Sequence, residues 1–202
     1  GRESITAKLT ANLLEKSGVD RVLAMDLHSA QIQGYFDIPC DHIYGSPVLI
    51  DYLETLDLEE IVVVSPDVGG VARARAFAKL MKDAPLAIID KRRSAHNIAE
   101  SLTVIGEVKG KTAILIDDMI DTGGTICSGA NLLKKEGANR IFACASHAVF
   151  SPPSYERLSS KNLFEQVIVT NSIPVIHKDN FPQLKVLSVA NMLGEAIWRI
   201  HE

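Results

Sequence analysis

Hydrophobic and polar positions along the chain form two alternating patterns: short apolar runs rich in Val and Ile, and longer stretches with helical periodicity. The first pattern is typical of buried β-strands and the second of amphipathic helices. The short runs predict strands at residues 21–27, 61–65, 86–90, 112–116, 141–145 and 167–170. The periodic stretches predict helices near residues 4–17, 46–56, 71–82, 126–136 and 189–201. This order predicts an α/β fold in which a parallel sheet carries helices on both faces.

Residues 113–125, AILIDDMIDTGGT, combine a buried strand with a polar loop that opens a helix. The apolar run at 113–116 is expected of a central strand that is covered on both faces. The loop at 122–125 offers hydroxyls and backbone N–H groups at a helix start predicted near Ile126. Because unpaired N–H donors and the helix dipole favour a phosphate dianion, the motif predicts a phosphate site.

Asp117 and Asp118 stand between this strand and the loop. There they could accept hydrogen bonds from a pair of vicinal hydroxyls or face a bound cation. Acidic residues after a strand are often helix caps or solvated loop residues, and Gly-Gly can be a simple turn. Together with Asp121, however, these carboxylates would repel an anion unless a sugar or metal separated them, which favours a ribose 5-phosphate site. The loop lacks the Gly-Lys-Ser/Thr of a Walker A motif, and no GxGxxG follows a strand.

Other strand ends carry further candidates, because the carboxyl ends of parallel strands meet at one edge of a sheet. His28 would be an unusual magnesium ligand or a direct phosphate contact, since magnesium prefers oxygen ligands. Asp67 precedes Gly69 and Gly70, whose backbone can approach an anion while the carboxylate holds a metal, although PDVGG is also an ordinary turn. His147 lies just past another strand end without an evident partner.

A cationic cluster at residues 91–93 follows the predicted strand at 86–90. Such clusters are usually solvated, but a position opposite acidic residues suits the neutralisation of a phosphoryl group in transfer. The next residues, 94–101, contain few large apolar side chains. We predict that they form a loop that closes over substrates and excludes water.

The composition narrows the class of protein. Over 202 residues, a hydrophobic content of 47% suits a soluble globular chain, and a net charge of −4 without a long basic stripe gives no reason to expect a nucleic acid partner. No segment is long enough to span a membrane, and the start GRESITAKL lacks an apolar signal core. Cys40, Cys127 and Cys144 form no CxxC pair, which favours buried thiols in a reducing, cytoplasmic setting. Because the chain begins with Gly1 rather than Met, we expect a missing N-terminal portion.

Four motifs, in this order, resemble those of the ribose-phosphate diphosphokinases, also called phosphoribosyl pyrophosphate synthetases. They are MDLHSAQIQGYFDIPCDH at 25–42, VVSPDVGG at 63–70, DKRR at 90–93 and ILIDDMIDTGGT at 114–125. The resemblance implies a type I phosphoribosyltransferase-like fold. It also implies transfer of the diphosphoryl group of magnesium ATP to the C1 hydroxyl of ribose 5-phosphate, which gives phosphoribosyl pyrophosphate and AMP.

The resemblance further implies a role for each matched residue. Asp117 and Asp118 would hold the ribose hydroxyls. The 5-phosphate would be bound by Asp121, Thr122, Gly123, Gly124 and Thr125. His28 and Asp67 would lie at the ATP phosphates and Mg²⁺, the implied cofactor. Lys91 and Arg93 would stabilise the transferred group as catalytic residues.

Members of this family are longer and consist of two tandem domains of this fold. By resemblance, residues 1–45 are the end of an N-terminal domain, residues 46–187 form the C-terminal domain, and residues 188–202 form a helix that packs back on the N-terminal domain. Family members form dimer-based hexamers with ATP sites at subunit contacts, which implies a homo-oligomer. Two alternatives stay open: a noncatalytic regulatory homologue that binds phosphoribosyl pyrophosphate or nucleotide, and a phosphoribosyltransferase, although no base-binding hood is recognisable.

Overall fold

The structure, a computed structural model, describes residues 5–92, 101–160, 163–176 and 181–202. The chain divides into two compact units, Gly1–Gly45 and Ser46–Glu202. This division groups residues 188–202 with the second unit, and their packing on the N-terminal part stays a prediction. Across the described ranges, none of the helices combines the length and the apolar character that a membrane crossing requires.

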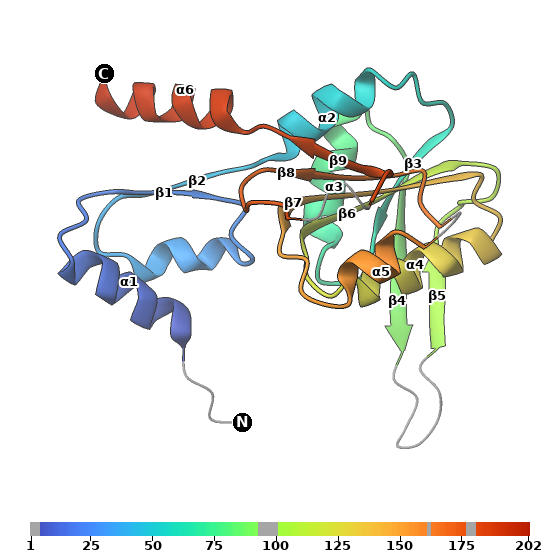
Figure 1. Cartoon of the computed structure of the whole chain (residues 1–202), viewed down its shortest axis with the longest axis horizontal. Coiled ribbons are helices and arrows are strands. Elements are labelled where there is room, and N and C mark those ends of the chain that lie inside the picture. Colours follow the sequence, from blue (N-terminus) through green and yellow to red (C-terminus); the bar gives the residue numbers. More distant parts are fainter. Residues whose placement is uncertain (1–4, 93–100, 161–162, 177–180) are drawn as a thin grey trace. The chain divides into compact units, whose positions relative to one another are not determined.

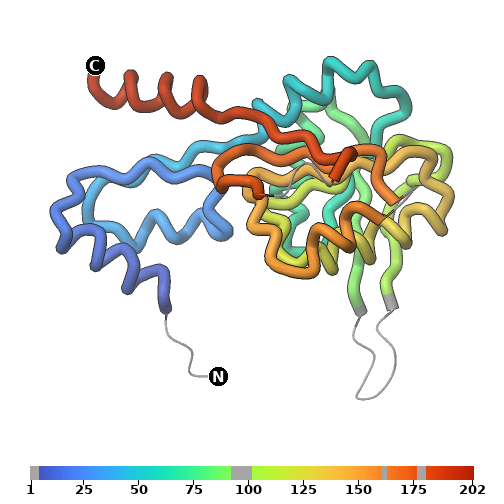
Figure 2. Tube along the Cα trace, in the orientation of Figure 1, coloured from blue at the N-terminus to red at the C-terminus, as the bar shows by residue number. Residues whose placement is uncertain are grey.

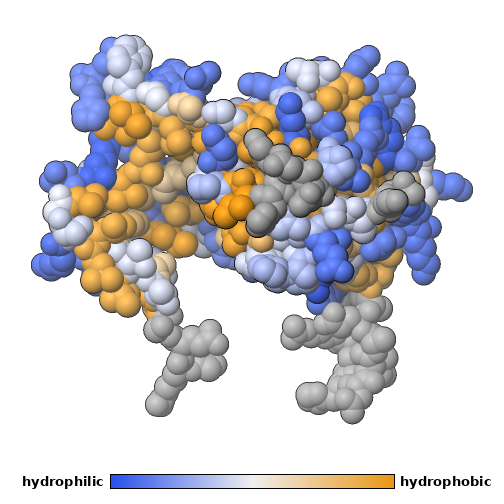
Figure 3. All heavy atoms as spheres, in the orientation of Figure 1, coloured by the Kyte–Doolittle hydropathy of each residue, from blue (hydrophilic) through white to orange (hydrophobic). Residues whose placement is uncertain are grey.

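The first unit contains a pair of short parallel strands. Its elements are α1 (Thr6–Lys16), β1 (Val22–Met25), the 3₁₀-helix η1 (Ala30–Tyr35) and β2 (Cys40–Ile43), with β1 paired to β2. Strand β1 and helix α1 fall in predicted ranges, whereas β2 and η1 were not predicted. Ile5, Leu9 and Leu13 follow one another at a spacing of one helical turn and are each more than half exposed. Figure 3 shows hydrophobic residues gathered on the visible face of this unit.

The second unit is a sheet with helices on both faces (Figure 1). Its elements are α2 (Ser46–Glu54), β3 (Ile61–Ser65), α3 (Val71–Leu80), β4 (Leu86–Arg92), β5 (Ser101–Ile105), β6 (Thr112–Ile120), α4 (Gly124–Lys135), β7 (Arg140–Ala148), α5 (Ser154–Leu158), β8 (Gln166–Thr170), β9 (Leu184–Leu187) and α6 (Ala190–His201). The sheet order is β5-β4-β3-β6-β7-β8-β9. The Cα trace in Figure 2 follows these strands side by side. The predicted α/β class is therefore confirmed.

Two apolar cores lie on opposite faces of this sheet, because successive residues of a strand point to opposite sides. Val63 and Ile114 pack with Phe77 of α3 on one face. Val64 and Leu115 belong to the other core, which includes Ile126, Ala130 and Leu133 of α4. Strands β3 and β6 are therefore apolar on both faces, as predicted for the run at 113–116. Because both faces of the sheet are covered, polar side chains can contact a ligand only at the ends of the strands.

Strand β5 departs from the predicted all-parallel sheet, since it pairs antiparallel with β4 at the edge. Its first residue, Ser101, falls in the range predicted as a loop, and that prediction is wrong for this residue. Leu102 and Val104 pack against the core while Ile105 is 52% exposed, so this edge strand shows only the weak alternation of a half-buried segment. Strand β9 and helix α5 are also short and were not predicted.

The cysteines are free thiols, as predicted, but they differ in burial. Cys144 is buried in β7, and this burial raises the pKa of its thiol. Cys40 and Cys127 are only half-buried, so the expectation of three buried thiols is wrong for these two.

Candidate functional site

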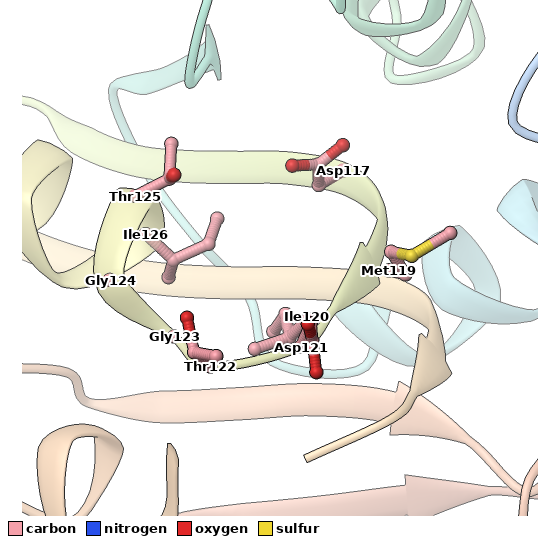
Figure 4. Close-up of a pocket in the computed structure, with 9 residues that line it drawn as sticks. All are labelled: Asp117, Met119, Ile120, Asp121, Thr122, Gly123, Gly124, Thr125 and Ile126. Atoms are coloured by element: carbon pink, nitrogen blue, oxygen red, sulfur yellow. The ribbon is translucent and has the colours of Figure 1, made fainter. Parts of the chain in front are cut away.

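A cavity of about 150 Å³ opens where β6 ends and α4 begins. It is lined by Asp117, Met119, Ile120, Asp121, Thr122, Gly123, Gly124, Thr125 and Ile126. Figure 4 shows the chain turning back on itself from Asp117 to Thr125, so that one continuous segment surrounds the space. The structure thus brings together the predicted loop residues and one of the two predicted strand-end carboxylates.

The loop conformation depends on Gly123. This residue has a φ of +73°, and a Cβ built on it would lie 3.3 Å from Cγ of Leu158 in α5. Left-handed backbone is open to glycine at little cost, which explains the glycine at this turn. Gly123 is the N-cap of α4, a helix of 12 residues, and so brings no capping side chain. The first N–H groups of a helix have no intrahelical acceptor, and the cavity therefore adjoins a position suited to an anion.

Asp117 and Asp118 occupy different environments. The Asp117 side chain lines the cavity and is 21% exposed, whereas the Asp118 side chain is 2% exposed and is not among the lining residues. The alternation of side chains along β6 separates them in this way. The backbone N–H of Asp118 donates to Oδ1 of Asp117 at 2.9 Å. In this conformation the Asp117 side chain, but not that of Asp118, can contact a ligand in the cavity directly.

Arg73 of α3 joins the two carboxylates. Its Nη1 lies 3.1 Å from Oδ1 of Asp117 and 3.3 Å from Oδ1 of Asp118. The sequence analysis missed this residue, although it carries a signal: it is the third residue of α3. A cation in the first turn of a helix interacts unfavourably with the helix dipole. An arginine at this position therefore indicates a function other than stabilising the helix.

The pKa of Asp117 is raised to about 7. Burial is the largest cause, and a side-chain hydrogen bond with Asp118 and the charge of Asp118 act in the same direction. The charge of Arg73 opposes them. Near neutral pH the carboxyl therefore exchanges between a proton donor and an acceptor-only form, and only the latter accepts two hydroxyl hydrogen bonds at full strength.

Arg157 of α5 lies against the loop. Its Nη1 donates to the carbonyl of Thr122 at 3.1 Å, and a Cβ built on Gly124 would lie 3.4 Å from the same nitrogen. Arg157 is exposed. A cation at this distance favours an anion in the loop, yet the sequence analysis missed Arg157 because α5, at five residues, shows little periodicity.

Asp67 lies three residues before Gly70, the N-cap of α3. Its Oδ1 accepts the N–H of Gly70 at 2.8 Å, and Oγ of Ser65 donates to its carbonyl at 2.6 Å. The residue is exposed, so its carboxylate is accessible to a ligand. In the described part of the chain, three or more His, Cys, Asp or Glu side chains do not gather as a metal site. Magnesium commonly takes only one or two carboxylates and completes its shell with phosphates and water, and Asp67 fits that use.

The remaining predicted residues are placed as follows. Lys91 is exposed near the end of β4, paired with Leu102 of β5. Arg93 lies outside the described residues, as does the predicted loop after it apart from Ser101. His28 is exposed and belongs to the first unit, and its role stays a prediction.

His147 has a partner that the sequence did not reveal. Its Nδ1 lies 2.8 Å from Oγ of Ser172, and the Ser172 hydroxyl donates to the carbonyl of Ser146 at 3.0 Å. In the sheet register His147 stands opposite Met119, a residue of the cavity wall. These hydrogen bonds connect the end of β7 to the segment after β8, next to the wall of the cavity.

Comparison with known proteins adds three findings. A family profile described as phosphoribosyl synthetase-associated domain matches residues 94–202. The chain is 95% identical over 202 residues to ribose-phosphate pyrophosphokinase of Prochlorococcus marinus subsp. pastoris, and 65% identical to ribose-phosphate pyrophosphokinase 1 of Spinacia oleracea. All of this chain aligns in both cases, but it spans only 61% and 60% of those relatives.

Among solved structures, the chain is similar to the crystal structure of phosphoribosylpyrophosphate synthetase from Mycobacterium smegmatis. The TM-score is 0.91 and the sequence identity 45%, over 100% of this chain and 65% of that one. The similarity to this synthetase therefore holds for both the fold and the sequence, over the whole length of the chain.

Proposed function

Because the chain belongs to the phosphoribosyl synthetase family, we propose that it takes part in the synthesis of phosphoribosyl pyrophosphate as the sugar phosphate-binding portion of a ribose-phosphate pyrophosphokinase. The proposed reaction transfers the diphosphoryl group of magnesium ATP to the C1 hydroxyl of ribose 5-phosphate. The C1 oxygen forms a bond to the β-phosphorus, the bond from this phosphorus to the α,β-bridging oxygen breaks, and AMP leaves. The proton of the C1 hydroxyl is released.

One observation supports this proposal above the others: Asp117 and the loop of residues 121–125 line the same cavity (Figure 4). A ribose 5-phosphate needs a cradle for its dianion and acceptors for its hydroxyls. The helix start at Gly124 suits the 5-phosphate, and Asp117 suits the hydroxyls. The Asp118 side chain is 2% exposed, so its proposed contact with the ribose requires the site to change conformation when the ligand binds.

Diphosphoryl transfer asks the protein mainly to align groups and to stabilise charge. Anchoring the sugar at both ends fixes the position of C1. Lys91 and Arg93 are the proposed catalytic residues, since cations at the transferred group stabilise charge that develops in the transition state. Thr122 and Thr125 add hydroxyls to the phosphate loop.

Asp67 is the proposed magnesium ligand of the second unit, because it offers hard carboxylate oxygens at an exposed helix start. Magnesium would supply neutralisation of the ATP phosphates and a fixed orientation of the diphosphoryl group. The matching proposal for His28, at ATP phosphates or metal, rests on the sequence resemblance. ATP is thus proposed as the second substrate.

The test is to incubate the chain with magnesium ATP and ribose 5-phosphate and to separate the nucleotide products. AMP together with phosphoribosyl pyrophosphate supports the proposal. Binding of ribose 5-phosphate without turnover supports the noncatalytic alternative for this chain. Formation of ADP, or absence of binding, contradicts the assigned reaction.

A further inference from the structure

The contacts of Arg73 point to a role that the matched motifs do not include. We propose that Arg73 is a positioning residue of the sugar phosphate site: by contacting Asp117 and Asp118 together, it orients both carboxylates and offsets their charge. Arg73 acts through these aspartates and needs no contact with the substrate. The inference rests on the proposed function, because it assumes that the cavity binds ribose 5-phosphate.

Electrostatics give the first reason. Two carboxylates in adjacent positions disfavour each other's ionised form, and burial disfavours it further. Asp118 is 2% exposed, and removing a cation that contacts a buried charge is costly. Arg73 is 23% exposed and lies within 3.3 Å of both groups, so its charge acts through a poorly solvated medium. With Arg73 the three groups carry a net charge of −1, and without it they carry −2 when both acids are ionised. A nearby phosphate dianion makes the second state still less favourable.

Geometry gives the second reason. Nη1 of Arg73 and the backbone N–H of Asp118 both donate to Oδ1 of Asp117, at 3.1 and 2.9 Å. Two donors on one oxygen restrict rotation of the carboxylate. A binding group held in one orientation loses less entropy when a ligand arrives. Arg73 therefore prepares Asp117 for the ribose hydroxyls.

The helix that carries Arg73 gives the third reason. Helix α3 starts at the segment 65–70, where Asp67 accepts the N–H of Gly70. A Cβ built on Gly70 would lie 2.9 Å from Oγ of Ser65 and 3.9 Å from Nη1 of Arg73. The guanidinium thus lies near the loop proposed for the ATP phosphates and contacts the carboxylates proposed for the sugar. Arg73 therefore lies between these two parts of the second unit.

A purely structural ion pair is the competing explanation, and it differs in what it predicts. If Arg73 only stabilises the fold, its replacement lowers the melting temperature but leaves the affinity of the folded protein for ribose 5-phosphate unchanged. If Arg73 positions the carboxylates, affinity falls, and lysine restores part of it. Lysine keeps the charge but cannot match the planar fork of arginine, so the rescue should be partial.

The experiment measures the dissociation constant of ribose 5-phosphate by calorimetry for the wild-type chain, Arg73→Met, Arg73→Lys and Arg75→Met. Arg75 is an exposed arginine on the same helix and gives a matched control. We expect Arg73→Met to weaken binding by about tenfold to a hundredfold, Arg73→Lys by less, and Arg75→Met to bind as wild type does. If Arg73→Met does not fold, the comparison of Arg73→Lys with Arg75→Lys decides in the same way.

A double-mutant cycle with Asp118→Asn tests the charge argument. Because Asp118→Asn removes one of the charges that Arg73 offsets, the double variant should lose less affinity than the sum of the single losses. Additive losses, or an unchanged dissociation constant in Arg73→Met with a lower melting temperature, would overturn the inference. A wild-type chain that binds no ribose 5-phosphate overturns the proposed function, and the inference with it; normal wild-type binding that Arg73→Met leaves unchanged overturns the inference alone.

Discussion

The charge of Asp117 should destabilise the ligand-free protein at neutral pH. Burial, reinforced by Asp118, raises the pKa of Asp117 from 3.8 to about 7, against the effect of Arg73. Between these two values the folded protein binds a proton that the unfolded chain has lost. Linkage then requires the contribution of Asp117 to the free energy of unfolding to fall as the pH rises through this window. Above it both states are ionised, and the full cost is present.

The size of the effect follows from the same shift. The change from 3.8 to about 7 corresponds to about 4 kcal/mol. Asp117→Asn removes this cost, but it also removes the charge-assisted character of the hydrogen bond from Arg73, worth about 1.5–3 kcal/mol. We therefore expect Asp117→Asn to increase the free energy of unfolding by about 1–3 kcal/mol above neutral pH. Below the lower pKa this gain should disappear.

Urea unfolding followed by far-UV circular dichroism, at a series of pH values across this window, measures the difference between wild type and Asp117→Asn. Asp121→Asn makes the same chemical change at an exposed position of the loop and should alter stability by no more than about 0.5 kcal/mol. The reasoning is refuted if wild type and Asp117→Asn lose stability in parallel as the pH rises. It is also refuted if Asp117→Asn is the less stable of the two above neutral pH.

Three further predictions concern the loop and the proposed catalytic cation. Gly123→Ala should cost about 1–2 kcal/mol of stability and weaken ribose 5-phosphate binding, because its φ is +73° and an added Cβ would press on Leu158; thermal unfolding and calorimetry measure these effects. Arg157→Gln should weaken ribose 5-phosphate binding by up to about fivefold and reduce its salt dependence, whereas Arg199→Gln, at an exposed helix position, should change neither. Lys91→Ala should slow AMP formation by about a hundredfold in steady-state assays with little change in sugar phosphate affinity, and a matching loss of affinity would contradict its role.

The phosphate loop could be predicted from the sequence because its determinants are local. An apolar run fixes the strand, the glycines permit the turn, and the helix follows within a few residues of Asp117. The observed start of α4 at Gly124 lies two positions before the predicted start near Ile126. Local patterns also gave the order of most strands and helices, which fixes the edge of the sheet where such a loop must lie.

Arg73 and Arg157 could not be found in this way, because their contacts depend on packing. Arg73 meets Asp117 across 44 positions in the sequence, and only the placement of β3 beside β6 brings them together. Arg157 meets Thr122 across 35 positions from a helix that is too short to show periodicity. The different environments of Asp117 and Asp118 likewise follow from the directions in which their side chains point on β6. Their adjacent positions in the sequence do not reveal which of the two faces the cavity.

Several unusual local features lie together at this cavity. Asp117 has a pKa raised by burial, Gly123 adopts a left-handed backbone, and Arg73 places a cation against the helix dipole. Elsewhere, Asp41 and Glu165 accept hydrogen bonds from Arg21 and Arg140, which lower the pKa of each carboxyl and favour the folded state. Selection for stability alone favours ion pairs such as those of Asp41 and Glu165. Binding of a sugar phosphate instead requires an uncapped helix start for the phosphate and a hydrogen-bond acceptor held in one orientation for the hydroxyls. A bound ribose 5-phosphate would engage both the helix start and Asp117, so the features that destabilise the ligand-free chain become the contacts that select the ligand.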